Sequence, residues 1–267
     1  MKNAMWVVVV LVLGGIAAGY FYWQMQRETP VPPVAEAPPP PPPPKPEPQI
    51  RHPIQPPATP GEKPLPSLEE SDAALAQVLT DFFGEKQVVE FIDLKDIVRR
   101  IVVTVDNLPR KKVPMRYRLF RPVAGQFQVA GTDRDLTLKP ENYRRYTPYV
   151  LLSQAVDVKT LVVTYVHFYP LFQEEYQQLG YPKGYFNDRL IEAIDDMLAA
   201  PEVKGPIRLE RPNVLYQFYD PDLEALSAGQ KILIRMGPEN AARIKARLRE
   251  LRRELTGQLS EPPKSAG

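Results

Sequence analysis

Apolar residues are arranged in three different ways along this chain of 267 residues. From Trp6 to Trp23 they form one run without a charged residue. Between residues 24 and 66 they are sparse among prolines, and from residue 67 onward they recur with helical spacing. A helix as long as the first run rises roughly 27 Å, close to the thickness of the hydrocarbon core of a bilayer. The pattern predicts a transmembrane anchor over 6–23, a spacer over 24–66, one folded domain over 67–257 and a disordered tail over 258–267.

The predicted anchor has aromatic residues at both ends, where a helix that spans a membrane meets the headgroups. Tyr20 to Trp23 form one cluster, and Trp6 stands at the other end. A cleaved signal peptide is the alternative, because Ala17 to Gly19 are small residues near a plausible cleavage site, but cleavage there would leave the aromatic cluster as the new N-terminus. The short tail over 1–5 carries Lys2 and predicts an N-in orientation, with the tail in the cytoplasm and the domain outside it.

The predicted spacer is dominated by proline. Most of the 32 prolines of the chain precede residue 66, including the run from Pro38 to Pro44. This composition cannot form a core and favours extended polyproline II. At about 3.1 Å per residue, residues 30–66 would reach roughly 110 Å from the bilayer. PxxP spacings in the run also fit a docking ligand, although any proline run contains them by chance.

Helical periodicity opens the folded domain. Ser67 and Glu70 have the spacing of a capping box, and apolar residues recur after them until Gly84, which predicts a first helix. A similar period from Phe91 to Asn107 predicts a second helix, which Pro109 stops.

The middle of the domain changes pattern twice. Alternating residues on either side of Gly131 predict a small β-hairpin between Met115 and Leu138. Helical spacing then returns over 143–154. Asp157 is expected to cap a long apolar helix that runs toward Leu179 and that Pro170 should kink.

The last third of the domain again reads as helical. Asn187 or Asp188 is expected to start a helix that ends before residue 201, and the segments 207–209 and 214–218 are short enough to pair as strands. A helix from Asp220 to Met236 and a final helix from Pro238 complete the domain. The predicted fold class is mainly α with a small β-hairpin, with about seven helices after the anchor.

Composition excludes several kinds of chemistry. The formal net charge of +2 gives no field that would select a nucleic acid. The chain has no cysteine, and its only histidines are His52 and His167. Disulfides, thiolate nucleophiles and multi-histidine metal sites are therefore excluded or improbable, and we expect no cofactor, no metal and no identifiable catalytic residue.

Four blocks of the sequence carry a resemblance to a known family. They are DNLPR at 106–110, LGYP at 179–182, YFNDRL at 185–190 and LSAGQK at 226–231. They resemble a bacterial family of membrane-anchored proteins that is described only as a domain of unknown function, and the resemblance covers residues 65–255. It implies a protein of the bacterial envelope. Together with the predicted N-in anchor, this leads us to expect a single-pass protein of the inner membrane with its domain in the periplasm. It carries over no activity, cofactor or site.

Polar residues gather at two predicted helix ends and form the candidate binding site. They are Asp106, Asn107, Arg110, Tyr185, Asn187, Asp188 and Arg189. In the structural interpretation, Asn and Asp accept backbone N–H groups and each Arg pairs with a nearby carboxylate. In the functional interpretation, the two ends converge into a polar cleft lined by aromatic rings that binds a peptide terminus or a sugar.

Other motifs are weaker. Glu70 followed by Ser71 matches the dipeptide around the acid of some wall-cleaving enzymes, but capping explains it equally well. Asp195 and Asp196 point in different directions on a helix, so they do not form a catalytic pair. Gly229 lacks the glycine-rich loop that a nucleotide site requires.

The last helix combines an apolar stripe with basic faces. It is expected to pack on its own domain, with a dimer seam or a contact with anionic lipid or wall polymer as alternatives. The stripe consists of Ile244, Leu248, Leu251 and Leu255.

The leading functional hypothesis is a periplasmic binding or scaffolding domain that contacts another envelope protein or peptidoglycan. The layout of anchor and spacer favours it, and so does the lack of catalytic chemistry. The alternatives are a peptidoglycan-active enzyme that uses carboxylates such as Glu70 or Asp188, and an assembly factor for exported proteins.

Overall fold

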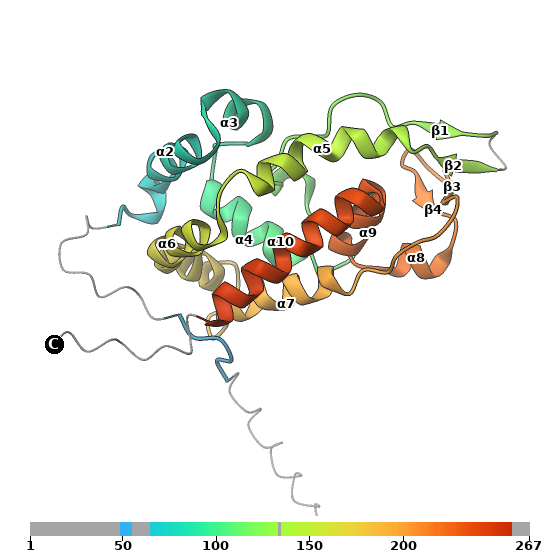
Figure 1. Ribbon diagram of the computed structural model, residues 1–267. Helices are drawn as coiled ribbons and strands as arrows, with labels where there is room; N and C mark the ends of the chain where they lie inside the picture. The colour runs from blue at the N-terminus through green and yellow to red at the C-terminus, as the bar shows by residue number, and fades with distance from the viewer. Residues whose placement is uncertain (1–48, 55–64, 133–134, 258–267) are drawn as a thin grey trace, which may run out of the picture. The chain divides into compact units, whose positions relative to one another are not determined.

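The computed structural model describes residues 49–54, 65–132 and 135–257, and these residues fold into a mainly helical domain with one small sheet (Figure 1). The described part of the chain contains nine α-helices, labelled α2 to α10, where the sequence predicted about seven. Helix α10 lies against α5, α6, α7 and α9, and α4 packs on α6 and α7 on another side. The predicted anchor, the run Pro38–Pro44 and the predicted tail lie outside the described residues.

The first helix, α2 (Ser71–Phe83), does not begin with the predicted capping box. The Ser67 side chain makes no capping hydrogen bond, and the chain enters α2 through the 3-10 turn η1 (Leu68–Glu70). Gly84 ends α2 as predicted. Its φ of 80° is costly for any residue with a Cβ, and the short helix α3 (Glu85–Phe91) follows it directly.

The predicted helix 91–107 is wrong in its first part, because α4 spans only Ile97–Asn107. Phe91 ends α3, and the extended residue Ile92 forms a β-bridge with Phe120, beside which the Asp93 amide donates to the Leu119 carbonyl. The Asp72 carboxylate of α2 then accepts hydrogen bonds from the amides of Asp96 and Ile97, each at 2.7 Å, and so caps α4. A capping group from another helix sets this start, and local periodicity cannot reveal it.

The predicted hairpin is confirmed and belongs to a four-stranded antiparallel sheet with the order β1-β2-β3-β4. Strands β1 (Val129–Ala130) and β2 (Leu136–Leu138) form the hairpin, and β3 (Arg208–Glu210) pairs with both β2 and β4 (Gln217–Phe218). Side chains of the strands contribute to one hydrophobic cluster. Its buried members are Leu136, Leu138, Ile207, Leu209, Phe218 and Ile234.

Helices α5 (Glu141–Gln154), α6 (Val158–Gln178) and α7 (Phe186–Leu198) lie where the sequence predicted them. Asp157 caps α6 as expected, accepting the amides of Lys159 and Thr160. The predicted cap of α7 is wrong, because Tyr185 occupies that position and its side chain makes no capping bond. Asn187 and Asp188 lie in the first turn instead, so their side chains are available to other partners.

The predicted helix from Asp220 to Met236 is divided into α8 (Pro221–Ala225) and α9 (Ala228–Met236). Ser227 begins α9 with a capping box that includes Gln230. The start of α9 docks on the end of α4, where the Gly229 amide donates to the Leu108 carbonyl at 2.9 Å. A Cβ at Gly229 would lie 2.7 Å from Met197, so the glycine of LSAGQK permits close helix packing.

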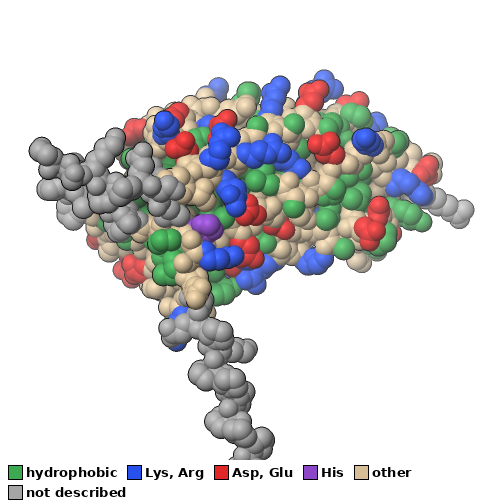
Figure 2. All heavy atoms as spheres, turned by 60° about the horizontal axis from the view of Figure 1, so that its bottom comes forward, with side chains coloured by type: hydrophobic (Ala, Val, Ile, Leu, Met, Phe, Trp, Pro, Cys, Tyr) green, Lys and Arg blue, Asp and Glu red, His purple; other side chains and the backbone are tan. Residues whose placement is uncertain are grey.

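The last helix, α10 (Pro238–Gly257), packs on its own domain. Leu248, Leu251 and Leu255 join a hydrophobic cluster with residues of α6 and α7. Arg252 pairs with Asp195 at 2.5 Å, whereas Asp196 accepts from the Ser227 hydroxyl at 2.6 Å, so the two neighbouring carboxylates do face different helices. Acidic and basic side chains are interspersed over the face shown in Figure 2.

Among the described residues, no single helix has the length and apolar character to cross a bilayer. Only α5 and α6 taken together, which are bent by 75° at their junction, meet those two criteria.

Candidate functional site

The predicted site residues fall into two neighbouring groups, and the first surrounds Asp106 at the end of α4. This carboxylate is 4% exposed and accepts hydrogen bonds from Arg110 Nη2 at 3.0 Å, Arg189 Nε at 3.1 Å and Tyr181 Oη at 3.3 Å. Arg189 also donates to the Asp106 carbonyl oxygen and pairs with Glu192 at 2.8 Å. The group is a buried ion-pair network that joins α4 to α7.

An aromatic pair closes one side of this network. The rings of Tyr176 and Tyr181 are stacked with centroids 4.6 Å apart. Burial, with a smaller contribution from the Asp106 carboxylate, raises the pKa of Tyr176 to about 12. Tyr176 is therefore a neutral hydroxyl at physiological pH.

The second group lies at the start of α7 and holds a short segment of the chain itself, which bends at Arg51 and His52. Residues 49–54, drawn in blue in Figure 1, pass this helix end. Asp188 Oδ2 accepts the Arg51 amide at 2.9 Å, and Asp188 Oδ1 accepts the His52 amide at 2.7 Å. Asn187 Nδ2 donates to the His52 carbonyl at 2.9 Å. We call Tyr185, Asn187 and Asp188 the clamp.

The third clamp residue acts at the far end of the bound segment. The Ile54 amide donates to Tyr185 Oη at 2.5 Å, and the same hydroxyl lies 3.5 Å from the Ile54 carbonyl oxygen. All of these hydrogen bonds reach main-chain atoms of the segment. The Ile54 side chain alone is directed into an apolar environment, where it packs against the core cluster of α2, α4 and α6.

A layer of buried polar groups from α6 holds the clamp in place. Tyr165 Oη donates to Asn187 Oδ1 at 3.1 Å, which leaves the Asn187 amide nitrogen for the bound segment. Gln173 accepts the Phe186 amide at 2.9 Å and donates to the Gly184 carbonyl at 2.8 Å, so it orders the turn that leads into α7. Asn187 is fully buried. The clamp is therefore preorganised by the fold.

Burial keeps the tyrosines of this layer protonated. It raises the pKa of Tyr165 well above the ordinary value, with a further contribution from Tyr185, and it also raises the pKa of Tyr169. The ring of Tyr169 lies 5.5 Å from that of Tyr185. The hydroxyls of Tyr165 and Tyr169 are therefore neutral at physiological pH.

A comparison with protein families identifies the family of this chain. The model of the family described as "Protein of unknown function (DUF3014)" matches residues 97–252. The chain belongs to this family. The resemblance inferred from the four sequence blocks is thereby confirmed. Nothing among curated proteins and nothing among solved structures matches the chain.

The DUF3014 match includes the clamp but not the segment that the clamp holds. Tyr185, Asn187 and Asp188 lie inside the matched range, and residues 49–54 lie far upstream of it. The side chains that bind the segment thus belong to the family domain, whereas the bound segment comes from the part of the chain assigned to the spacer.

The sequence grouped residues that the structure separates. Asp106, Arg110 and Arg189 form the buried network, and Tyr185, Asn187 and Asp188 form the clamp. Asn107 belongs to neither, because its side chain donates to the Val103 carbonyl of its own helix at 2.8 Å. Sequence reasoning did not find Arg51 to Ile54, Tyr165 or Gln173 as parts of the site. The available indication was a pair of apolar residues, Ile50 and Ile54, within a proline-rich stretch.

The carboxylates considered for catalysis have other roles in the DUF3014 domain. Both oxygens of Asp188 are occupied by main-chain amides, and Glu70 is exposed at the end of a 3-10 turn. In the described ranges, no group of three or more His, Asp or Glu side chains is placed to hold a metal ion.

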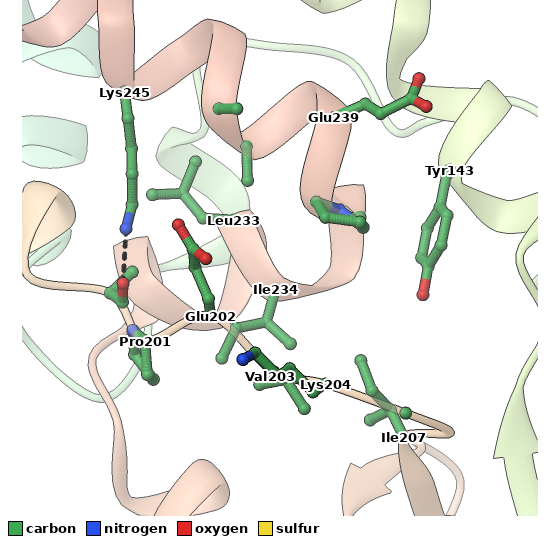
Figure 3. Close-up of a pocket in the computed structure, with 16 residues that line it drawn as sticks. Tyr143, Pro201, Glu202, Val203, Lys204, Ile207, Leu233, Ile234, Glu239 and Lys245 are labelled. Atoms are coloured by element: carbon green, nitrogen blue, oxygen red, sulfur yellow. Dashed lines mark hydrogen bonds between the residues drawn. The ribbon is translucent and has the colours of Figure 1, made fainter.

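The DUF3014 domain also has a pocket of about 660 Å³ between α9, α10 and residues 200–207 (Figure 3). Leu233, Ile234 and Ile207 form its apolar floor, and Tyr143 faces it from α5. Lys245 of α10 donates to the Ala200 carbonyl at 2.5 Å across one end. A pocket of this volume can hold a small ligand. The contacts that resemble those of a bound ligand, however, are the hydrogen bonds between the clamp and residues 49–54.

Proposed function

We propose that this protein is a single-pass protein of the bacterial inner membrane whose domain lies in the periplasm and works as a binding or scaffolding module. The predicted anchor and spacer support the location. The clamp supports the activity, and it suggests that the module recognises a short peptide segment of another envelope protein.

One observation carries this proposal: the clamp binds a segment through its main chain. Asp188 accepts the amides of Arg51 and His52, and Asn187 donates to the His52 carbonyl that follows them, so the clamp binds the backbone of the segment where it bends. Recognition of a peptide commonly combines main-chain hydrogen bonds for affinity with side-chain pockets for specificity. Here Ile54 supplies the apolar side chain that packs on the core, so a partner segment needs a backbone that can bend in the same way and an apolar residue in that place.

The bound segment is suited to exchange. It is connected to Leu65 of the domain by residues 55–64 alone, and its contacts are a few hydrogen bonds and one apolar side chain. A linker of that length gives the segment a millimolar effective concentration, which a partner must overcome. We infer that residues 49–54 occupy the clamp until a partner with a better-fitting segment replaces them.

The alternative of a peptidoglycan-active enzyme has less support. Asp188 serves as an acceptor of main-chain amides, and Glu70 is exposed at the end of a 3-10 turn instead of lying in the buried apolar environment that a catalytic carboxylic acid requires. The lack of muropeptide release by the purified protein would agree with a binding role.

A crosslinking experiment in intact cells tests the binding role. A photo-crosslinking residue is placed at Pro182, which is exposed in the turn before the clamp, and at Ala246, which is exposed on α10, as a control. We expect one dominant envelope protein at position 182, absent at position 246 and lost when Asp188→Ala is added. The same set of products at both positions, or products that persist in Asp188→Ala, would contradict the proposal.

The placement has its own test. A reporter that is active only in the cytoplasm, fused to the C-terminus, is expected to be inactive. An active reporter would contradict the periplasmic location while leaving the clamp unaffected.

A further inference from the structure

The loop between α4 and β1 is strongly basic and carries no acidic residue. Its sequence from 110 to 122 is RKKVPMRYRLFRP, and no Asp or Glu occurs between Asn107 and Asp133. Apolar and aromatic residues alternate with the basic ones over 115–121. The formal net charge of +2 for the whole chain gives no indication of this local concentration of positive charge.

The fold holds the middle of this loop in place, with Leu119 packed on the core and Met115, Arg116, Phe120 and Arg121 exposed. Arg100 of α4 donates to the carbonyl oxygens of Arg116 at 2.9 Å and Arg118 at 3.0 Å, and it pairs with Asp93 at 3.0 Å. The Arg100 side chain is only 11% exposed. The buried guanidinium holds these two carbonyl oxygens on the inner side of the loop. The backbone of the loop is therefore fixed, and its exposed side chains form a defined surface.

Two large apolar side chains project from that surface. Met115 is 69% exposed and Phe120 is 43% exposed. They lie beside a pocket of about 310 Å³ that Arg116, Arg118 and Arg121 also line. We call Met115, Arg116, Arg118, Phe120 and Arg121 the basic surface.

The arginines of the basic surface lack the acidic partners that other arginines of the domain have. Among the described residues, no carboxylate lies within ion-pair distance of Arg116, Arg118 or Arg121. Arg116 instead lies over the Tyr117 ring, 4.6 Å from its centroid. Their positive charge is therefore available to an external anion.

We propose that the basic surface docks on an anionic phospholipid membrane. Exposed apolar side chains that enter the headgroup layer, flanked by arginines that contact lipid phosphates, are the features of an interfacial membrane contact. The pocket beside Phe120 is large enough for one phosphate headgroup. This inference rests on the loop alone and does not depend on the clamp or on the predicted anchor.

The lack of cysteine allows a direct test in the full-length protein. Met115→Cys is the only thiol in the chain, and it is labelled with an environment-sensitive fluorophore after reconstitution into vesicles. We expect quenching by lipids with a spin label near the headgroup when the vesicles contain phosphatidylglycerol. Quenching should be at least ~10-fold weaker in phosphatidylcholine vesicles and should decrease at high salt.

Matched variants separate charge from folding. Arg116→Gln with Arg118→Gln should abolish the quenching, whereas Arg249→Gln with Arg253→Gln, two exposed arginines of α10, should leave it unchanged. Equal quenching in both kinds of vesicle would overturn the proposal. A response of the label to soluble polyglutamate but not to anionic vesicles would also overturn it, in favour of an acidic protein partner.

Discussion

The side-chain amide of Asn187 donates a hydrogen bond to the carbonyl of His52, a residue 135 positions earlier in the chain. The same side chain accepts the hydroxyl hydrogen of Tyr165. Asn187 thus connects a fixed element of the core to a segment that reaches the domain from the N-terminal side. This connection is the reason to regard the start of α7 as a binding site.

Asn187→Ala should weaken both the domain and the clamp. The change leaves the buried Tyr165 hydroxyl without its acceptor, which costs roughly 1–3 kcal/mol of unfolding free energy. It also removes the donor to the His52 carbonyl, so amide hydrogen exchange over residues 51–54 should accelerate. Denaturant unfolding and hydrogen exchange measure the two effects. An unchanged exchange rate over 51–54 would show that Asn187 does not hold the segment in solution.

Asp188→Ala should release the segment while leaving the domain folded. Its carboxylate is part-exposed and serves the amides of Arg51 and His52, so its loss should leave the melting temperature almost unchanged. Hydrogen exchange at those two amides should rise toward the rate of an unstructured peptide. Asp222→Ala on α8, an exposed carboxylate far in sequence from the clamp, serves as the control.

Arg189→Ala should lower stability strongly, which distinguishes the Asp106 network from the clamp. Asp106 is almost fully buried, and without Arg189 it keeps only the partly exposed Arg110 as its cationic partner. Removal of one partner from a buried pair costs roughly 3–5 kcal/mol. A variant that kept its melting temperature but lost a binding partner would instead place Arg189 in the binding site.

Asp72→Ala should destabilise the domain by roughly 1–2 kcal/mol, because it removes the cap of α4. Asp72 accepts the amides of Asp96 and Ile97 from a neighbouring helix. Asp81→Ala on the same helix should have little effect, since Asp81 only accepts from the exposed side chain of Gln77. Equal losses in the two variants, measured by denaturant unfolding, would contradict the capping role.

The raised pKa of Tyr176 predicts a loss of stability at high pH. Its pKa rises to about 12 in the folded state because burial disfavours the phenolate, and Asp106 adds to the effect. The folded state therefore holds the proton more tightly than the unfolded state, where the pKa is about 10. Its stabilising contribution is complete below pH ~10 and is lost as the pH rises toward 12. Unfolding between pH 8 and 11 should show a weaker pH dependence in Tyr176→Phe.

The parts of the fold that depend on local sequence were predictable. Asp157 caps α6 from within its own segment, and Gly131 lies in the turn of the predicted hairpin, so short-range patterns were sufficient. The start of α4 and the break between α8 and α9 were missed because distant groups determine them. Asp72 caps the former, and the docking of Gly229 on Leu108 accompanies the latter.

The candidate site was predictable in its residue types but not in its partners. Asn, Asp and Tyr at the start of a helix indicated side chains able to bind main-chain groups. Their bound segment lies in a proline-rich stretch whose composition indicates a spacer, and only the isoleucines Ile50 and Ile54 distinguish the segment from its surroundings. The separation of Arg189 from Asp188 follows from helix geometry, because neighbouring residues on a helix face different directions.

The binding of a peptide in trans tests the central claim most directly. In the full-length protein with residues 49–54 replaced by glycine and serine, the clamp is free. A fluorescent peptide with the sequence of residues 49–54 should then bind, measured by anisotropy. Binding should be at least ~10-fold weaker in the unaltered protein, where the resident segment competes, and should be lost when Asp188→Ala is added to the open variant. If the open variant binds the peptide no better than its Asp188→Ala derivative does, the start of α7 is not a peptide-binding site.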